Sequence, residues 1–231
     1  MMVMVMLSRE DFENYGRMTV DLANQASAEF DQFVKSLKVT DYWPVRETIM
    51  DFAEGLIREY GGAAALNAAD FFEMQTGIAN ALASESIDLK SLDTSLRYAI
   101  SQARYDALEK SPLSAVNQNI ARQTKNYAHQ TMVDNARENR TMFARVPTGA
   151  HTCAFCMMLA SRGFVYYSKR SAGEMMQFHN DCDCHVVAGV DGVEGYDPDA
   201  LYSDYRDARE NANSGNYKDV LAQMRKDLGV K

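Results

Sequence analysis

The sequence predicts a mainly α-helical protein: an N-terminal helical bundle over residues 1–145, a small α+β module over residues 146–190 and a helical, acidic C-terminal tail over residues 191–231. Three observations support this prediction. The 231 residues include only four prolines, and 46% of them are hydrophobic, which is enough to bury a core in one or two domains. The helical pattern stops near Phe143, where Pro147 and Gly149 indicate a linker. All four cysteines lie in the last third of the chain.

Apolar residues recur at helical spacing through most of the first 145 residues. Ser8 is the expected N-cap of the first helix. The second helix is expected to begin near Pro44 and to end at Gly61–Gly62, because a glycine commonly follows the last turn of a helix. The expected helices cover residues 8–37, 44–60, 63–74, 89–108 and 113–141.

Shorter elements are expected after Phe143. A helical turn at 157–160 should end at Ser161–Gly163, and the β-branched and aromatic residues at 164–167 favour a strand. A second strand is expected at 184–187, where alternation would place Cys182 and Cys184 on one face. The acidic tail should form two helices, at 199–212 and 217–228.

The cysteines occur in two clusters whose spacing is typical of a zinc site. The first cluster is Cys153-Ala154-Phe155-Cys156, and the second runs from His179 to His185 as H-x2-C-x-C-H. Five residues are candidate ligands for the four positions of a structural zinc ion, and which four bind is left open. They are Cys153, Cys156, His179, Cys182 and Cys184, with His151 and His185 in reserve.

Two other roles for the cysteines compete with metal binding: buried apolar side chains and disulfides. Buried cysteines often serve as small apolar side chains, but that role does not require ligand spacing. Two disulfides would need an oxidising compartment. The apolar residues 1–7 are too short for a signal-peptide core and lack a basic leader, so a reducing cytoplasm is expected and metal binding is favoured. No uncharged stretch is long enough to span a membrane.

Charge is distributed unevenly along the chain. The net charge is −8, yet residues 121–170 contain eight basic and two acidic residues, which gives +6 there and leaves −14 elsewhere. This window predicts either a basic strip that faces an acidic partner or DNA, or an ordinary solvated face. The strip would consist of Arg122, Lys125, His129 and Arg140 on one helix, continued by Arg145, Arg162, Lys169 and Arg170.

Several of these segments together resemble a known family. The segments are Arg145–Gly149, the C-x2-C element, Leu159–Gly163 and the H-x2-C-x-C element. They are similar to the MuF-type minor head proteins of tailed bacteriophages, in particular those of actinobacterial phages and prophages. The resemblance covers residues 145–187. It implies a structural minor capsid protein that acts in head morphogenesis at or near the portal, with the portal protein and a scaffold or major capsid protein as partners and DNA as a weaker candidate.

The resemblance also implies a location in the virion or prohead interior, with the host cytoplasm as the site of assembly. The ligand set agrees with a structural role. A catalytic zinc ion keeps one coordination position open, whereas here five candidate ligands compete for four positions. No catalytic residue is assigned. The alternative function is a head maturation protease or a nuclease. Ser161 with His151 or His179 is its only suggestive pairing, and no G-x-S-x-G motif supports it.

Overall fold

The structure is a computed structural model that describes residues 6–39, 41–85, 88–103, 113–148, 152–166 and 182–231. The chain divides into two compact units. Unit 1 consists of residues 1–16, 70–81 and 132–231, and unit 2 consists of residues 17–69 and 82–131. The division falls inside three helices, so each unit is assembled from separate segments of the chain.

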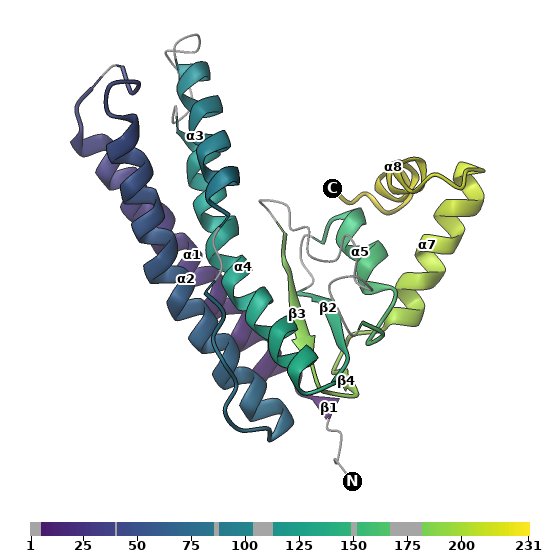
Figure 1. The fold of residues 1–231 in the computed structure, drawn as a ribbon. Helices are drawn as coiled ribbons and strands as arrows, with labels where there is room; N and C mark the ends of the chain where they lie inside the picture. The colour runs from purple at the N-terminus through teal and green to yellow at the C-terminus, as the bar shows by residue number, and fades with distance from the viewer. Residues whose placement is uncertain (1–5, 40, 86–87, 104–112, 149–151, 167–181) are drawn as a thin grey trace. The chain divides into compact units, whose positions relative to one another are not determined.

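Four long helices account for most of the first 138 residues (Figure 1). They are α1 (Arg9–Ser36), α2 (Arg46–Thr76), α3 (Leu89–Ala103) and α4 (Ser114–Glu138). Ser8 caps α1 as expected, since its Oγ accepts a hydrogen bond from the backbone N–H of Asp11 at 3.1 Å. No helix among the described residues is long and apolar enough to cross a membrane.

The core of unit 2 is formed where apolar faces of these helices meet. Aromatic and aliphatic side chains from α1, α2, α3 and α4 pack together there, because burying an apolar stripe is the main source of helix stability in a folded protein. The largest fully buried members are Phe30, Ile49, Ile57, Leu92, Leu96, Ile100 and Leu113.

The expected end of a helix at Gly61–Gly62 is wrong, because α2 continues through both residues to Thr76. The reason is packing. A Cβ atom added to Gly61 would lie 2.7 Å from Cδ2 of Tyr127, whereas a Cβ atom on Gly62 would meet no atom within 4 Å. Because Gly61 has no Cβ atom, the backbone of α2 can approach the Tyr127 ring on α4. Gly61 therefore serves a packing contact inside a continuous helix and does not end it.

Unit 1 is built around a two-stranded antiparallel ladder. Strand β2 (Phe143–Pro147) pairs with β3 (Cys184–Ala188), with Phe143 opposite Ala188 and Pro147 opposite Cys184. Figure 1 shows the two strands side by side, with the short helix α5 (Ala154–Ala160) next to them. Pro147 thus ends a strand and is not part of a linker, which corrects that expectation. Gly149 lies outside the described residues.

Two short strands that are far apart in the sequence also pair in unit 1. Strand β1 (Met6–Leu7) runs parallel to β4 (Gly192–Val193). The strand expected at 164–167 is reduced, in the described residues, to one bridge between Tyr166 and Phe143, while Tyr167 lies outside the described part of the chain. Helix α5 ends as expected, with Gly163 at a φ of 64°.

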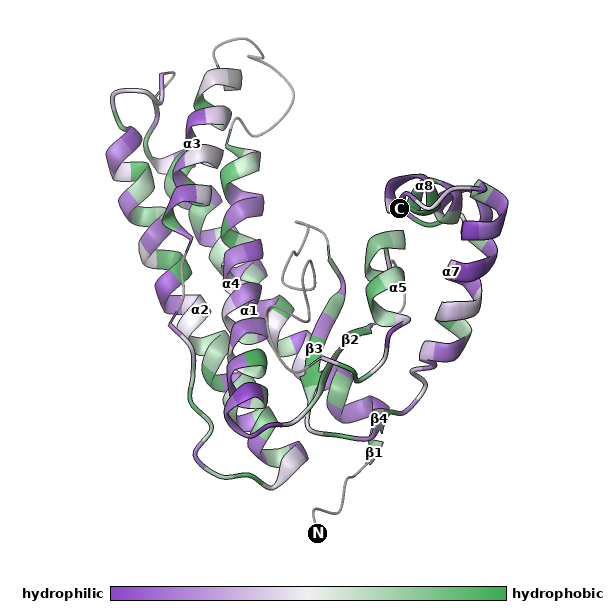
Figure 2. Ribbon diagram, turned by 45° about the vertical axis from the view of Figure 1, so that its right-hand side comes forward, coloured by the Kyte–Doolittle hydropathy of each residue, from purple (hydrophilic) through white to green (hydrophobic). Residues whose placement is uncertain are grey.

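The acidic segment forms two helices, α7 (Pro198–Ala212) and α8 (Tyr217–Leu228), within a residue of their expected positions. Asp197 and Asn216 cap their N-termini. Figure 2 shows α5 as mostly hydrophobic and α7 as largely hydrophilic, and both α7 and α8 pack against α5. The segment is therefore part of unit 1, although the sequence predicted a separate tail.

The fold class predicted from the sequence is confirmed: helices dominate the described residues, and the only sheets among them are small. The predicted division at residue 145 differs from the observed units. The strand Phe143–Pro147 belongs to the same unit as α5 and β3, and so do residues 132–138 of α4.

Candidate metal centre

Helix α5 positions the first two cysteines. Cys153 is the N-cap of α5, and its Sγ accepts a hydrogen bond from the backbone N–H of Cys156 at 3.4 Å. Cys156 lies in the first turn of the helix and is fully buried, whereas Cys153 is half-buried. A C-x2-C element at the start of a helix places both thiols on the same side of that turn.

The second pair of cysteines comes from the segment that leads into β3. Cys182 and Cys184 are buried, and their thiols meet that of Cys156. The Sγ of Cys156 lies 3.5 Å from that of Cys182 and 3.2 Å from that of Cys184. The predicted placement of Cys182 and Cys184 on one face is confirmed. Because all four cysteines are free, the structure contains no disulfide.

The spacing of the sulfur atoms fits a metal ion. Thiolates about 2.3 Å from a tetrahedral zinc ion lie about 3.8 Å from one another. The sulfurs of Cys156, Cys182 and Cys184 are all within 4.8 Å of one another, and two of their separations are 3.2 and 3.5 Å. These three residues could therefore hold a metal ion with little rearrangement.

Cys153 lies beside this group but is not part of it, because among the described residues only the sulfurs of Cys156, Cys182 and Cys184 are mutually within 4.8 Å. Its side chain is within hydrogen-bonding range of the thiols of both Cys156 and Cys182. Of the five candidate ligands, the structure thus brings Cys156, Cys182 and Cys184 together, with Cys153 next to them at the start of α5. His179, the fifth candidate, and His151 lie outside the described residues.

His185 faces away from the thiols. In the β2–β3 ladder His185 is paired with Val146, and it directly follows Cys184 in β3. Because adjacent residues of a strand point to opposite faces, the side chain of His185 points away from the thiols. It is buried there, with its ring 5.5 Å from that of Tyr15 and 6.2 Å from that of Phe12. The reserve ligand His185 is therefore a core residue of unit 1.

Arg145 lies against the thiol cluster and was missed by the sequence analysis, which placed it on a surface strip. It is completely buried. Its Nε and one Nη atom lie 3.2 and 2.8 Å from the Sγ of Cys184, and the same Nη is 3.6 Å from the sulfurs of Cys156 and Cys182. The register of β2 against β3 puts Arg145 on the face of β2 that neighbours Cys184, and no local pattern in the sequence records that register.

The surroundings change the acidity of the cysteines. Hydrogen bonds from the Cys153 and Cys156 thiols lower the pKa of Cys182 to about 6. Burial opposes ionisation of Cys184, but hydrogen bonds from Cys156 and Cys182 and the charge of Arg145 bring its pKa well below the ordinary value. Hydrogen bonding to Cys153 and Cys182 raises the pKa of Cys156. Thiolate, the form that binds metal, is therefore favoured at Cys182 and Cys184 relative to a free cysteine.

Comparison with known proteins identifies the family. A family model described as "VG15 protein" matches residues 6–208, which is most of the chain and includes residues of both units. The chain belongs to the VG15 family. This is a family of viral proteins. No curated protein and no solved structure gives a significant match. The viral origin implied by the MuF resemblance is thus confirmed, while the MuF type and the actinobacterial host remain predictions.

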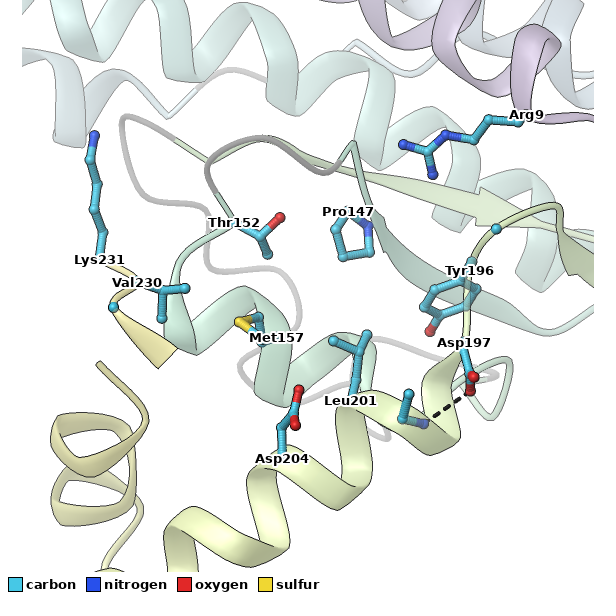
Figure 3. Close-up of a pocket in the computed structure, with 13 residues that line it drawn as sticks. Arg9, Pro147, Thr152, Met157, Tyr196, Asp197, Leu201, Asp204, Val230 and Lys231 are labelled. Atoms are coloured by element: carbon cyan, nitrogen blue, oxygen red, sulfur yellow. Dashed lines mark hydrogen bonds between the residues drawn. The ribbon is translucent and has the colours of Figure 1, made fainter. Parts of the chain in front are cut away.

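This VG15 protein also has a pocket of about 660 Å³ in unit 1, between α5, α7 and residues 229–231 (Figure 3). Met157 and Leu201 contribute apolar walls, and Arg9 and Asp204 lie at its rim. Asp197, which also lines it, caps α7 by accepting hydrogen bonds from the N–H groups of Asp199 and Ala200. Among the described residues, no cysteine or histidine lines this pocket. The cysteine cluster is therefore the stronger candidate site in this member of the family.

Ser161, the suggested nucleophile of the alternative function, has a structural role in this VG15 protein. It is the C-cap of α5, and its hydroxyl donates a hydrogen bond to the carbonyl oxygen of Met158 at 2.8 Å. His151 and His179, its suggested partners, lie outside the described residues. The described part of the chain therefore gives no geometric support to a serine nucleophile.

Two residues of the predicted basic strip are not on the surface. His129 and Arg145 are each at most 1% exposed. Arg122 and Lys125 are half-buried, Arg140 and Arg162 are exposed, and Lys169 and Arg170 lie outside the described residues. The excess positive charge of residues 121–170 is thus partly internal, because Arg145 is directed at the thiols.

The ligand set gives a direct prediction. Replacing His179 with alanine is expected to leave a bound metal ion, because Cys156, Cys182 and Cys184 supply three thiols and Cys153 is the remaining thiol of the chain. Replacing Cys182 with alanine should remove the ion. The measurement is metal content of the two purified variants by mass spectrometry. Loss of metal from His179→Ala would show that the histidine replaces one of the thiols.

Proposed function

We propose that this protein is a structural, MuF-like minor head protein of a tailed bacteriophage that acts in capsid assembly at or near the portal. The observation that carries the proposal is the match of a viral family model to residues 6–208. The cysteine motifs between residues 145 and 187 support the finer assignment, because they resemble the metal-binding elements of MuF-type proteins.

We further propose that the four cysteines bind one structural zinc ion. Four thiols without an open position suit a closed site that stabilises a fold, whereas catalytic zinc keeps one position for water or substrate. Zinc is favoured because thiolate ligands in a tetrahedral arrangement select it among the common divalent ions. The ion would join α5 to the segment that leads into β3, so it would link two parts of unit 1 that are distant in sequence.

The proposed partners are the portal protein and a scaffold or major capsid protein. DNA is a weaker candidate, because the remainder of the chain carries a net charge of −14 against the +6 of residues 121–170. The protein would be found in the prohead or virion and, during assembly, in the host cytoplasm.

Assembly in a heterologous host tests this proposal. The chain would be co-expressed with portal and major capsid proteins of a tailed bacteriophage, and proheads would be purified and analysed by quantitative mass spectrometry. The expected result is a low-copy component of proheads that contain portal, with the capsid protein uncleaved. Proheads without portal serve as the control and should lack the chain. Cleavage of the capsid protein, abolished by Ser161→Ala, would support the alternative protease function.

A further inference from the structure

The guanidinium of Arg145 is an unusual neighbour for a metal site, because it is a permanent charge with no exposed surface. Burying a charge is costly unless it is paired and hydrogen-bonded. Two of its nitrogens lie within 3.2 Å of Cys184 Sγ, and one also lies 3.6 Å from the sulfurs of Cys156 and Cys182. The sulfur atoms of the cluster are therefore positioned to stabilise this charge.

The negative charge of a zinc–thiolate centre also requires a nearby cation, and Arg145 is positioned to provide it. A zinc ion with four thiolates has a net charge of −2, and three of these four cysteines are buried. A cation within hydrogen-bonding distance reduces that charge to −1. N–H groups that point at coordinated sulfur also withdraw electron density from it and make it less nucleophilic.

The strands explain how Arg145 reaches the sulfurs. Pro147 is paired with Cys184 in the β2–β3 ladder, and Arg145 is two residues before Pro147. Arg145 and Cys184 are therefore diagonal neighbours on one face, where long side chains meet. His185 and Val146 occupy the other face. The ladder thus fixes the guanidinium beside the thiols and keeps the histidine away from them.

We propose that Arg145 is a positioning residue of the metal centre: it donates hydrogen bonds to the zinc-bound thiolates, supplies their counter-charge and protects them from electrophiles. This inference rests on the proposed zinc centre. The site would bind zinc tightly while its thiolates react slowly with electrophiles. The reactivity of these thiolates would depend on Arg145, a side chain that does not contact the metal.

The test compares full-length, zinc-loaded wild type with Arg145→Met, Arg145→Lys and the surface control Arg137→Met. Arg137 pairs with Asp134 and is exposed, so its loss should not alter the site. Zinc affinity is measured by competition with a chelator, and thiolate reactivity by zinc release on alkylation. We expect about 10–100-fold weaker zinc binding and faster alkylation in Arg145→Met, with partial rescue in Arg145→Lys. Wild-type affinity and alkylation rate in Arg145→Met would overturn the proposal.

A second measurement needs no variant. In wild-type protein loaded with ¹¹³Cd, guanidinium protons of Arg145 that donate to coordinated sulfur should show scalar coupling to the metal nucleus. Rapid exchange of these protons with solvent, without coupling, would overturn the proposal even if Arg145→Met failed to fold. A wild type that binds no zinc would overturn the proposed zinc centre itself. A wild type that binds zinc, together with an Arg145→Met variant of unchanged zinc affinity and alkylation rate, would overturn only the role of the arginine.

Discussion

Replacing Cys156 with serine is expected to remove the metal ion and to unfold the part of unit 1 built from β2, α5 and β3. The thiol of Cys156 is at the centre of the cluster, with the sulfurs of Cys182 and Cys184 at 3.5 and 3.2 Å. Binding of zinc to a thiolate site contributes roughly 10–16 kcal/mol of apparent free energy at neutral pH. That is as large as the whole net stability of a typical domain, which is about 5–15 kcal/mol.

The measurement is metal content together with hydrogen exchange of the β2 and β3 amides. Ala160→Ser is the matched control, because it introduces a serine at a buried position of the same helix and keeps every thiol. It should lose stability but keep the metal. A chelator should reproduce the effect of Cys156→Ser in the wild type and have no further effect on the variant. A folded, metal-free Cys156→Ser protein with wild-type exchange protection would contradict a structural metal.

Alanine substitutions at Gly61 and Gly62 are expected to change stability in opposite directions. In Gly62→Ala the new methyl group meets no atom within 4 Å, so the gain in helix propensity should stabilise the protein by about 0.5–1 kcal/mol. In Gly61→Ala the methyl group would lie 2.7 and 2.8 Å from Cδ2 and Cγ of Tyr127. Cγ is the ring atom bonded to Cβ, so it cannot move without the rest of the side chain. Overpacking should therefore lower the free energy of unfolding by about 1–3 kcal/mol, which outweighs the gain in helix propensity.

The two variants are each other's control, because they make the same change at adjacent positions of one helix. Urea denaturation followed by circular dichroism measures the free energy of unfolding of each. Gly61→Ala combined with Tyr127→Leu should recover part of the loss, since the smaller side chain leaves room for the methyl group. Equal stabilisation by both single substitutions would mean that α2 and the Tyr127 ring are not in close contact.

Local signals in the sequence determined several elements well. The two C-terminal helices were predicted within a residue, and the structure shows that Asp197 and Asn216 cap their first turns. The cysteine cluster was also predictable, although Cys156 and Cys184 are distant in sequence, because ligand chemistry restricts which residues must meet. The helix end at Gly61–Gly62 was mispredicted because a contact with Tyr127, which no local pattern records, overrides the tendency of glycine to end helices.

The role of Arg145 was missed for a similar reason. Counting charges treats each arginine as solvated, and only the register of β2 against β3 reveals that this one is enclosed. The three-segment composition of unit 1 was not predictable either. It depends on the pairing of Met6–Leu7 with Gly192–Val193, and strands of two residues carry almost no periodicity signal.

The pairing of β1 with β4 has a consequence for the order in which the protein matures. Unit 1 needs residues 6–16 together with residues 182–193, so it cannot be completed on the ribosome until residue 193 has been synthesised. The two segments of unit 2, in contrast, are both synthesised by residue 131. Closing a long loop costs entropy before any contact compensates for it. Capture of a metal ion by Cys156, Cys182 and Cys184 would then follow the synthesis of unit 2, whose last residue is 131.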